Sequence, residues 1–244
     1  MAKRVFVAGA SGAIGQRLCP LLVADGWQVT GTTRSREKAE WLRAMRVEPV
    51  IVDVFDEQAL REAVIAAKPS IVVHQLTELP DVLDPKLMDE ASVRNAHMRQ
   101  VGTRHLVAAA VAARVTRLVA QSIAFAYAPG PTPYREDAPL NVSGTGRAGV
   151  SARGVASLEE QVLAAPLEGI VLRYGRLYGP HTGVGAPPPG GAVHIDAAAD
   201  AAHRALTRGK RGIYNNAESD GAVSSDKAAQ DLDWSADFRS GVRA

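Results

Sequence analysis

Short runs of apolar and β-branched residues alternate with amphipathic segments along most of the chain. The runs predict strands at 4–8, 28–33, 47–52, 70–74, 116–121, 169–173 and 212–215. Periodic apolar positions between them predict a helix ending at residue 24 and further helices at 35–44, 57–67, 84–113, 157–163 and 197–206. Because short strands alternate with helices, we expect a parallel sheet covered by helices on both faces.

A glycine-rich turn separates the first predicted strand from the first helix. The segment 5–15 reads VFVAGASGAIG, with Gly9, Gly12 and Gly15 at three-residue intervals. Gly9 permits a tight turn, Gly12 lets a pyrophosphate approach the backbone, and Gly15 lets the helix pack closely on the strand. The start of the helix then offers free N–H groups and a positive dipole end to the phosphates. A glycine turn between a strand and a helix predicts a dinucleotide site.

This motif and the strand–helix alternation together predict the fold class. We expect an α/β protein with a Rossmann-type, doubly wound, mostly parallel sheet and a minimal C-terminal substrate lobe. Residues 1–244 are expected to form a single domain. Its dinucleotide-binding half would span 1–125, and a reduced substrate-binding half would span 126–244.

The end of the second strand indicates which dinucleotide is bound. An NAD site places an acid there for the ribose 2′-hydroxyl, whereas an NADP site places a basic residue near the 2′-phosphate. This chain has Thr33, Arg34 and Ser35, and no acid before Glu37. Arg34 can make paired hydrogen bonds with a phosphate, and the hydroxyls can add donors. We therefore predict NADP as cofactor, with NAD as the less favoured choice.

Several motifs beyond the turn resemble one family. These are VVHQLT at 72–77, VGTRHLVAAA at 101–110, RLVAQS at 117–122, REDAPL at 135–140 and LRYGRLYGP at 172–180. With the turn and Asp53, they are similar to the extended short-chain dehydrogenase/reductase superfamily, in its NAD-dependent epimerase/dehydratase branch. The resemblance continues through VHIDAAADAAHRAL, GIYNNAE and SSDKAAQDLDW. It covers nearly the whole chain, which is therefore expected to be complete.

The turn and the three strand ends that follow it give the expected cofactor contacts. Asp53 and Val54 follow the third strand, where the adenine ring would stack. The full predicted set is Gly9, Ser11, Gly12, Ala13, Ile14, Gly15, Thr33, Arg34, Ser35, Asp53, Val54, Gln75, Leu76 and Thr77.

The family's catalytic pair is missing from this chain. The resemblance implies a YxxxK motif in which the Tyr transfers a proton and the Lys lowers the pKa of that Tyr. An acid four residues after the Lys marks the register in this branch. Counted from Glu159, the Tyr and Lys positions hold Ser151 and Val155; counted from Glu160, they hold Ala152 and Ala156. No Tyr or Lys occurs anywhere in 135–166.

The substrate half is also short. Where the resemblance implies a nucleotide-sugar lobe of several tens of residues, only the Pro- and Gly-rich stretch 181–193 is present. This size argues against a nucleotide-sugar substrate. We expect instead a small molecule bound near the loops at 127–145 and 181–191, beyond the carboxyl ends of the strands.

Two residues remain as candidates for catalysis. Ser122 ends the fifth strand, where the resemblance implies contact with a substrate carbonyl. Tyr127 lies five residues later and could replace the missing acid, because a phenol with an ordinary pKa near ~10 suits proton donation in carbonyl reduction. His74 is expected to be structural. Arg176 occupies a position where the resemblance implies Asn, and it is a candidate anchor for an anionic substrate.

Two functions stay open at this point. The first is an NADP-dependent oxidoreductase or epimerase-like protein acting on a small carbonyl or hydroxyl compound. The second is a catalytically reduced NAD(P)-binding sensor or regulatory protein. The missing pair favours the second, while the retained LRYGRLYGP motif favours the first.

Composition excludes several other classes. Hydrophobic residues make up 46% of the chain, and the net charge is +2 without a long run of one sign, so neither disorder nor a nucleic-acid or membrane partner is indicated. A lone cysteine, Cys19, excludes an internal disulfide. The absence of HExxH, CxxC and paired-carboxylate motifs predicts no metal site. Without a signal peptide or a bilayer-length apolar run, the protein is expected to be cytoplasmic.

The long central helices suggest a partner. Their apolar positions exceed what one sheet face needs, and the resemblance implies that such helices pair across a two-fold axis. We therefore expect a homodimer through Val107, Ala108, Val111, Val155, Leu158 and Val162.

Overall fold

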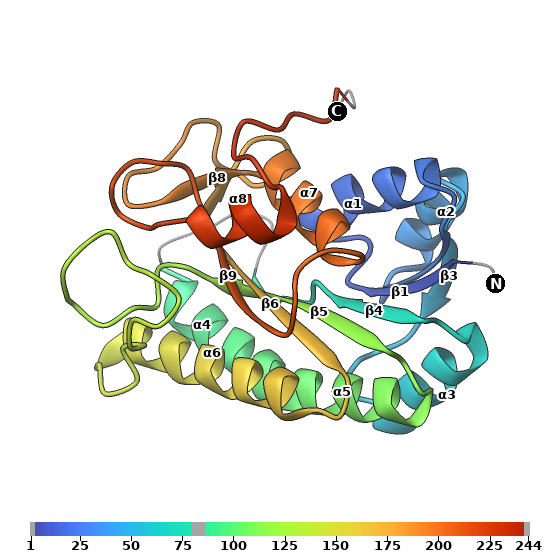
Figure 1. Cartoon of the computed structure of the whole chain (residues 1–244). Coiled ribbons are helices and arrows are strands. Elements are labelled where there is room, and N and C mark those ends of the chain that lie inside the picture. The colour runs from blue at the N-terminus through green and yellow to red at the C-terminus, as the bar shows by residue number, and fades with distance from the viewer. Residues whose placement is uncertain (1–2, 80–85, 242–244) are drawn as a thin grey trace.

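Seven parallel strands form one twisted sheet with helices on both faces (Figure 1). The computed structural model describes residues 3–79 and 86–241. The strand order is β3-β2-β1-β4-β5-β6-β9, so the predicted Rossmann-type fold is confirmed. The strands are β1 (Arg4–Ala8), β2 (Gln28–Thr33), β3 (Glu48–Ile51), β4 (Ile71–His74), β5 (Arg117–Ile123), β6 (Glu168–Tyr174) and β9 (Gly212–Asn216).

The helices divide between the two faces of the sheet. Helices α1 (Ala13–Ala24), α2 (Arg36–Ala44) and α7 (Ile195–Ala205) contribute to the hydrophobic cluster on one face. Helices α3 (Glu57–Ala67), α5 (Thr103–Ala112) and α6 (Gly146–Ala164) contribute to the cluster on the other. Helix α8 (Asp226–Leu232) lies beside β9 near the end of the chain. None of the helices in the described ranges is long and apolar enough to cross a membrane.

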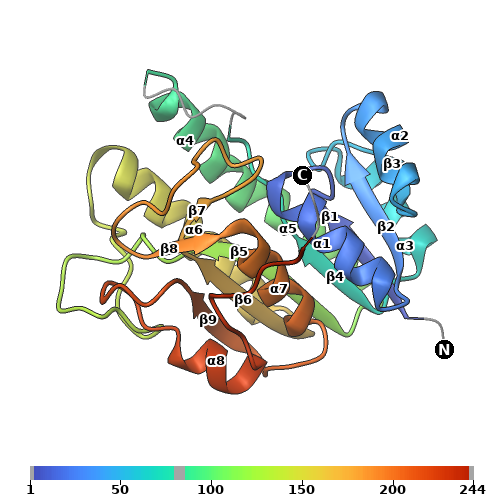
Figure 2. The ribbon, with the colours of Figure 1, turned by 90° about the horizontal axis from the view of Figure 1, so that it is seen from above.

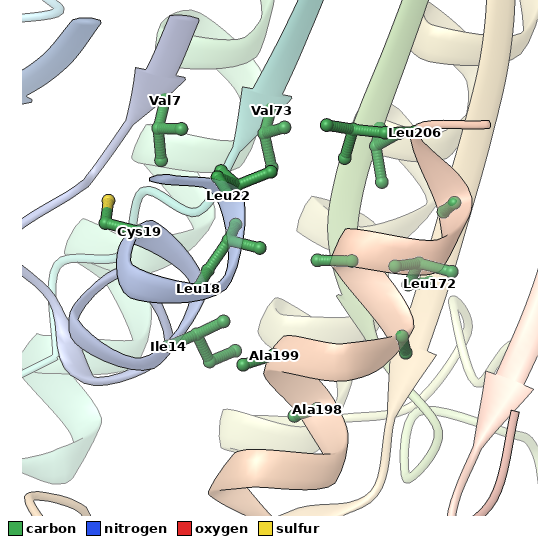
Figure 3. Close-up of a cluster of buried hydrophobic side chains, with 14 of the residues drawn as sticks. Val7, Ile14, Leu18, Cys19, Leu22, Val73, Leu172, Ala198, Ala199 and Leu206 are labelled. Carbon is green, nitrogen blue, oxygen red and sulfur yellow. The ribbon is translucent and has the colours of Figure 1, made fainter. Parts of the chain in front are cut away.

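Close packing of α1 against α7 joins the two halves of the chain (Figure 3). Ile14, Leu18 and Leu22 of α1 are almost wholly buried, and they point toward the alanine-rich face of α7. The alanines let the two helices approach closely, because their small side chains occupy little space between the helix axes. Figure 2 shows the result: α1 and α7 lie side by side on one face of the sheet.

Two predicted helices differ from the structure, and one pair of strands was not predicted. The helix expected at 84–113 contains a π-helical turn, giving α4 (Met88–His97), η1 (Met98–Gly102) and α5; residues 84 and 85 lie outside the described part. Helix α6 begins eleven residues earlier than predicted. Its glycines have a low helix propensity, so the sequence pattern does not indicate this part of the helix, which tertiary packing stabilises. A small parallel pair, β7 (Arg176–Tyr178) and β8 (Ala192–His194), was not predicted.

The expected dimer surface also needs correction. Val155, Leu158 and Val162 of α6 are buried inside the chain itself, so they cannot face a partner. Val111 is 39% exposed, and Val93 on α4 is 57% exposed. The apolar surface of this face therefore comes from α4 and α5.

Strand order sets the position of a ligand site. The chain runs outward from β1 to β2 and β3, and then crosses back to β4 on the other side of β1. At such a switch point the loops after neighbouring strands diverge, which opens a crevice at the carboxyl ends of the strands.

Candidate functional site

A cavity of about 600 Å³ lies at this switch point. It is lined by the glycine turn and by residues that follow β2, β3 and β4. Eleven of the fourteen predicted cofactor contacts line it: Gly9, Ser11, Gly12, Ala13, Ile14, Thr33, Arg34, Val54, Gln75, Leu76 and Thr77. The other three, Gly15, Ser35 and Asp53, lie outside its lining.

The glycine turn has the geometry that a pyrophosphate needs. Gly9 has φ +87°, and a Cβ there would lie 2.6 Å from the Gln75 carbonyl oxygen. The Gly12 N–H donates to the Gly9 carbonyl oxygen at 3.0 Å and closes the turn. Among the described residues, the Gly9 carbonyl oxygen at 3.3 Å is the only atom that would lie within 4 Å of a Cβ on Gly12. The outer side of Gly12 therefore opens into the cavity.

Gly15 serves packing rather than ligand contact. A Cβ at this position would lie 2.4 Å from the Gly9 carbonyl oxygen and 2.5 Å from that of Ala10. Only glycine lets α1 begin directly on the turn. These distances agree with the packing role expected of Gly15. Because Gly15 lies outside the cavity lining, its contact with the cofactor stays a prediction.

Two cations line the cavity near the end of β2. The Thr33 hydroxyl accepts hydrogen bonds from the Ser11 hydroxyl at 3.1 Å and from the Ser35 N–H at 3.2 Å. The Ser35 hydroxyl caps α2 by accepting from the Lys38 N–H at 3.2 Å. Arg34 and Lys38 both line the cavity, so the first turn of α2 adds a second cation. Lys38 was missed in the sequence, although it is four residues after Arg34.

Asp53 is used to shape a turn. Its carboxylate accepts from the Phe55 N–H at 3.0 Å, which directs the side chain into the loop after β3. Val54 instead lines the cavity, and its carbonyl oxygen lies 3.0 Å from His105 Nδ1. The apolar surface expected for an adenine ring is therefore supplied by Val54 and its neighbour Val52.

The end of β4 forms the next wall. His74 Nδ1 accepts from the Leu76 N–H at 3.2 Å, so Nε2 carries the proton and donates to the Thr103 hydroxyl at 2.9 Å. Burial, with a contribution from the charge of Arg99, lowers the pKa of His74 to about 4. His74 is thus a neutral structural residue, as its position suggested. Gln75 lines the cavity, and its buried Oε1 has no hydrogen-bond partner among the residues that the structure describes.

The structure does not place the predicted catalytic residues in the cavity lining. Ser122 is 2% exposed and donates to Glu159 Oε1 at 2.7 Å. The Tyr127 hydroxyl donates to Asn215 Oδ1 at 2.6 Å and accepts from Arg173 Nη1 at 2.9 Å. Successive side chains of a strand point to opposite faces, and Gln121, not Ser122, lines the cavity. Both predicted residues therefore belong to a buried polar network behind the strand.

Arg173 and Glu159 are the centre of that network. Arg173 Nε donates to Glu159 Oε1 at 2.8 Å, and Nη2 donates to Oε2 at 2.6 Å. These paired hydrogen bonds raise the pKa of Arg173 further, although burial opposes them. The hydrogen bonds and charge of Arg173 favour ionised Tyr127, but burial of the ring outweighs them and raises the pKa of its phenol. A buried phenol with a raised pKa is a poor proton shuttle at neutral pH.

The opposite end of the cavity was not predicted. It is lined by Gln121 of β5, Met98 of η1, Leu177 of β7 and the loop residues His181, Thr182 and Gly183. The Gln121 amide donates to the Leu76 carbonyl oxygen at 2.9 Å. The sequence contained one signal for Gln121, because it is a polar residue near the end of a buried strand. Arg176, expected to anchor an anion, lies over the Phe125 ring at 4.5 Å instead of in the cavity lining.

The cavity fits an extended dinucleotide. Its cations lie at the β2 end, the glycine turn lies at its centre, and an unpartnered amide oxygen and a polar strand end lie beyond. In this fold a dinucleotide lies across the crevice at the switch point, with its pyrophosphate at the start of the first helix. Within the described ranges, no group of three metal-ligating side chains is close enough to hold an ion.

Comparisons with known proteins agree with this geometry. The profile of a family described as NAD(P)H-binding matches residues 9–207. A 3-diazoavenalumate denitrifying reductase from Streptomyces sp is 48% identical over 182 residues, which are 74% of this chain and 58% of that protein. The chain thus spans less than two thirds of this relative's length.

Solved structures share the fold at low sequence identity. UDP-glucose 4-epimerase from Thermotoga maritima superposes with a TM-score of 0.76 at 16% identity, covering 95% of this chain and 93% of that one. UDP-glucose 4-epimerase from Brucella ovis, in complex with NAD, gives 0.73 at 16% identity, covering 96% and 93%. These structures show the fold that the resemblance implied, and the matches lie among oxidoreductase- and epimerase-like proteins.

Proposed function

Because the chain belongs to the NAD(P)H-binding family, we propose that it is an NADPH-dependent reductase that delivers hydride to a small electrophile. The observation that carries this proposal is that one cavity is lined by the glycine turn, by the cations at the β2 end and by Gln121 at the other end. A cofactor held along this wall would present its nicotinamide beside Gln121, Leu177 and His181.

Preference for NADPH rests on charge at the β2 end. Arg34 and Lys38 line the cavity there, and Glu37 does not. A 2′-phosphate dianion would gain charge-assisted hydrogen bonds from the guanidinium and the ammonium, whereas a 2′-hydroxyl would gain little. The structures solved with NAD share the fold, and they do not bear on this choice.

The chemistry at the other end narrows the class of substrate. Reduction of a carbonyl creates an alkoxide that needs a proton, yet neither register of the family resemblance, Ser151 with Val155 or Ala152 with Ala156, supplies the implied Tyr and Lys. Of the described residues lining this end, His181 is the titratable one, and it is exposed. A cationic acceptor avoids the problem, because adding hydride to it gives a neutral product.

An arenediazonium ion is such an acceptor, and the relative from Streptomyces is named for a diazo compound. NADPH, when bound, supplies the hydride, so that arenediazonium and NADPH give arene, dinitrogen and NADP⁺. The substrate gains an N–H bond at its terminal nitrogen, the C–N bond then breaks with loss of dinitrogen, and the proton moves to the ring carbon. No external acid is consumed. In this scheme the chain's own residues bind, orient and shield the reactants from water.

The test is stoichiometric reduction by the purified chain. With 4-carboxybenzenediazonium, one NADPH should be consumed for each arene and each dinitrogen formed. Gly12→Val should abolish NADPH binding in calorimetry and stop this reaction while the circular dichroism spectrum is retained, because a branched side chain would occupy the phosphate position. Gly130→Ala is the matched control, because Gly130 is exposed, its φ is not positive, and an added Cβ would make only ordinary contacts at 3.7 Å or more.

Other outcomes would redirect the proposal. Reduction of aldehydes or ketones, with diazonium ions inert, would support the carbonyl class instead. Tight NADPH binding without turnover on either panel would favour the sensor function. We further propose a cytoplasmic homodimer that acts on a small molecule and has no nucleic-acid or membrane partner.

A further inference from the structure

The π-helical turn η1 places Arg99 directly after Met98 at the substrate end of the cavity, although Arg99 and Ser151 are not themselves part of the lining. This turn interrupts the helix that runs from α4 into α5, and α4 lies beside α6 (Figure 1). Met98, the first residue of η1, lines the cavity, and Arg99 follows it. A single π-helical turn inside a helix is energetically unfavourable and is often found at functional sites.

In the register counted from Glu159, Arg99 reaches the helix position where the family resemblance implies the catalytic tyrosine. Its Nη1 donates to the Ser151 hydroxyl at 3.0 Å and to the Ser151 carbonyl oxygen at 3.5 Å. Val155, where the resemblance implies the lysine, is fully buried. A guanidinium therefore lies beside the position from which the phenol and ammonium are missing.

The charges around Arg99 do not balance. Arg99 is 7% exposed, Arg173 is 3% exposed and Glu159 is 4% exposed, so two guanidiniums share one buried carboxylate. Both oxygens of Glu159 are hydrogen-bonded to Arg173, and Ser122 also donates to one of them. In the described part of the chain, the Arg99 guanidinium forms hydrogen bonds only with Ser151.

This cation persists at neutral pH. Burial lowers the pKa of Arg99 to about 10, and the charge of Glu159 acts against that change. A buried charge without a hydrogen-bonded counter-ion is costly, so an anion bound here would be stabilised strongly. Guanidinium groups match the planar geometry of oxyanions through paired N–H donors.

We propose that Arg99 and Ser151 form a subsite for an oxyanion of the substrate, a carboxylate or a phenolate, beside the nicotinamide end of the cavity. This inference rests on the proposed function for the location of the substrate. It predicts that the substrate carries an oxyanion in addition to its electrophilic group, and that it is held by this oxyanion while the hydride acceptor lies further along the cavity.

The test is binding of matched inert probes to NADP⁺-saturated protein. Calorimetry would compare benzoate with benzamide, and 4-nitrophenolate at mildly alkaline pH with 4-nitroanisole. The protein should bind at least one anion about tenfold or more tightly than its neutral partner, which is the scale of a charge-assisted hydrogen bond. Which anion is preferred distinguishes the carboxylate from the phenolate.

Variants assign this preference to Arg99. Arg99→Gln should remove it, and Arg99→Lys should retain part of it. Arg94→Gln should leave it unchanged, because Arg94 lies exposed on α4 and pairs there with Glu90. If Arg99→Gln does not fold, Ser151→Ala takes its place, with a few-fold loss of anion affinity expected.

Two results would overturn the subsite: wild-type protein with NADP⁺ bound that binds anions and neutral probes equally, or an anion preference that survives Arg99→Gln. NADP⁺ affinity is measured first. Failure at that step would count against the proposed function, whereas equal probe binding with NADP⁺ in place would count against the subsite alone.

Discussion

Arg34 and Glu78 form an ion pair at the cavity, with 2.7 Å between Nη1 and Oε1. Arg34 follows β2 and Glu78 follows β4, so the pair joins the ends of two strands that flank β1. The Glu78 N–H donates to Asn95 Oδ1 at 3.0 Å, which fixes the backbone of the acid against α4. The residue expected to bind a 2′-phosphate is therefore already engaged by a carboxylate.

This pairing predicts an unusual gain of function. Glu78→Gln should tighten NADPH binding about three- to tenfold, because it frees Arg34 and removes repulsion of the 2′-phosphate. NADH affinity should change less than about twofold by the same reasoning. Glu90→Gln, which breaks an exposed pair on α4, is the control. Arg34→Ala should have the opposite effect on NADPH alone. Equal changes for both cofactors would show that neither residue contacts the 2′-phosphate.

The buried network predicts that Tyr127 contributes to stability. Tyr127→Phe should lower the free energy of unfolding by about 1–3 kcal/mol, because it leaves Arg173 and Asn215 short of a partner. Turnover and NADPH affinity should be nearly unchanged. Urea denaturation and steady-state kinetics on the same preparation test this. A large loss of turnover at unchanged stability would restore the catalytic role first expected of Tyr127.

Stability should depend on pH through His74. Its pKa is lowered to about 4 in the folded chain, so between an unfolded value of about 6.5 and that value the unfolded state binds more protons. Stability is therefore full above this window and falls as the pH falls through it. From about pH 7 to about pH 5 the loss should be about 2 kcal/mol. His74→Gln should flatten this part of the profile, and an unchanged slope would exclude His74 as its source.

The exposed apolar residues of α4 and α5 bear on assembly. Val93 on α4 and Val111 on α5 are exposed large apolar residues, and we propose that the surface around them pairs in a homodimer. Light scattering at micromolar concentration should give twice the chain mass. Val111→Asp should shift the protein to a monomer, because a charge in an apolar interface is costly to bury. A monomeric wild-type mass would remove this proposal.

Local patterns determined much of the fold. The glycine spacing, the Ser35 cap and the alternation of strands and helices each depend on residues near one another, so the sequence indicates them directly. These features gave the parallel sheet, the start of α1 and most of the cavity lining. The NADP preference indicated by Arg34 stays a prediction, and Lys38 strengthens it.

Tertiary structure decided the rest. Along β5 both faces are buried, so the sequence shows no alternation that tells whether Gln121 or Ser122 faces the cavity. Glu78 meets Arg34, and Ser151 meets Arg99, across long separations in the chain. Such contacts arise only when strand order and helix packing bring distant segments together. The sequence by itself determined the glycine turn of the dinucleotide site, because the geometry of this turn depends on residues close together in the chain. Packing determined which charges surround the reacting end of the site, because these charges come from different elements.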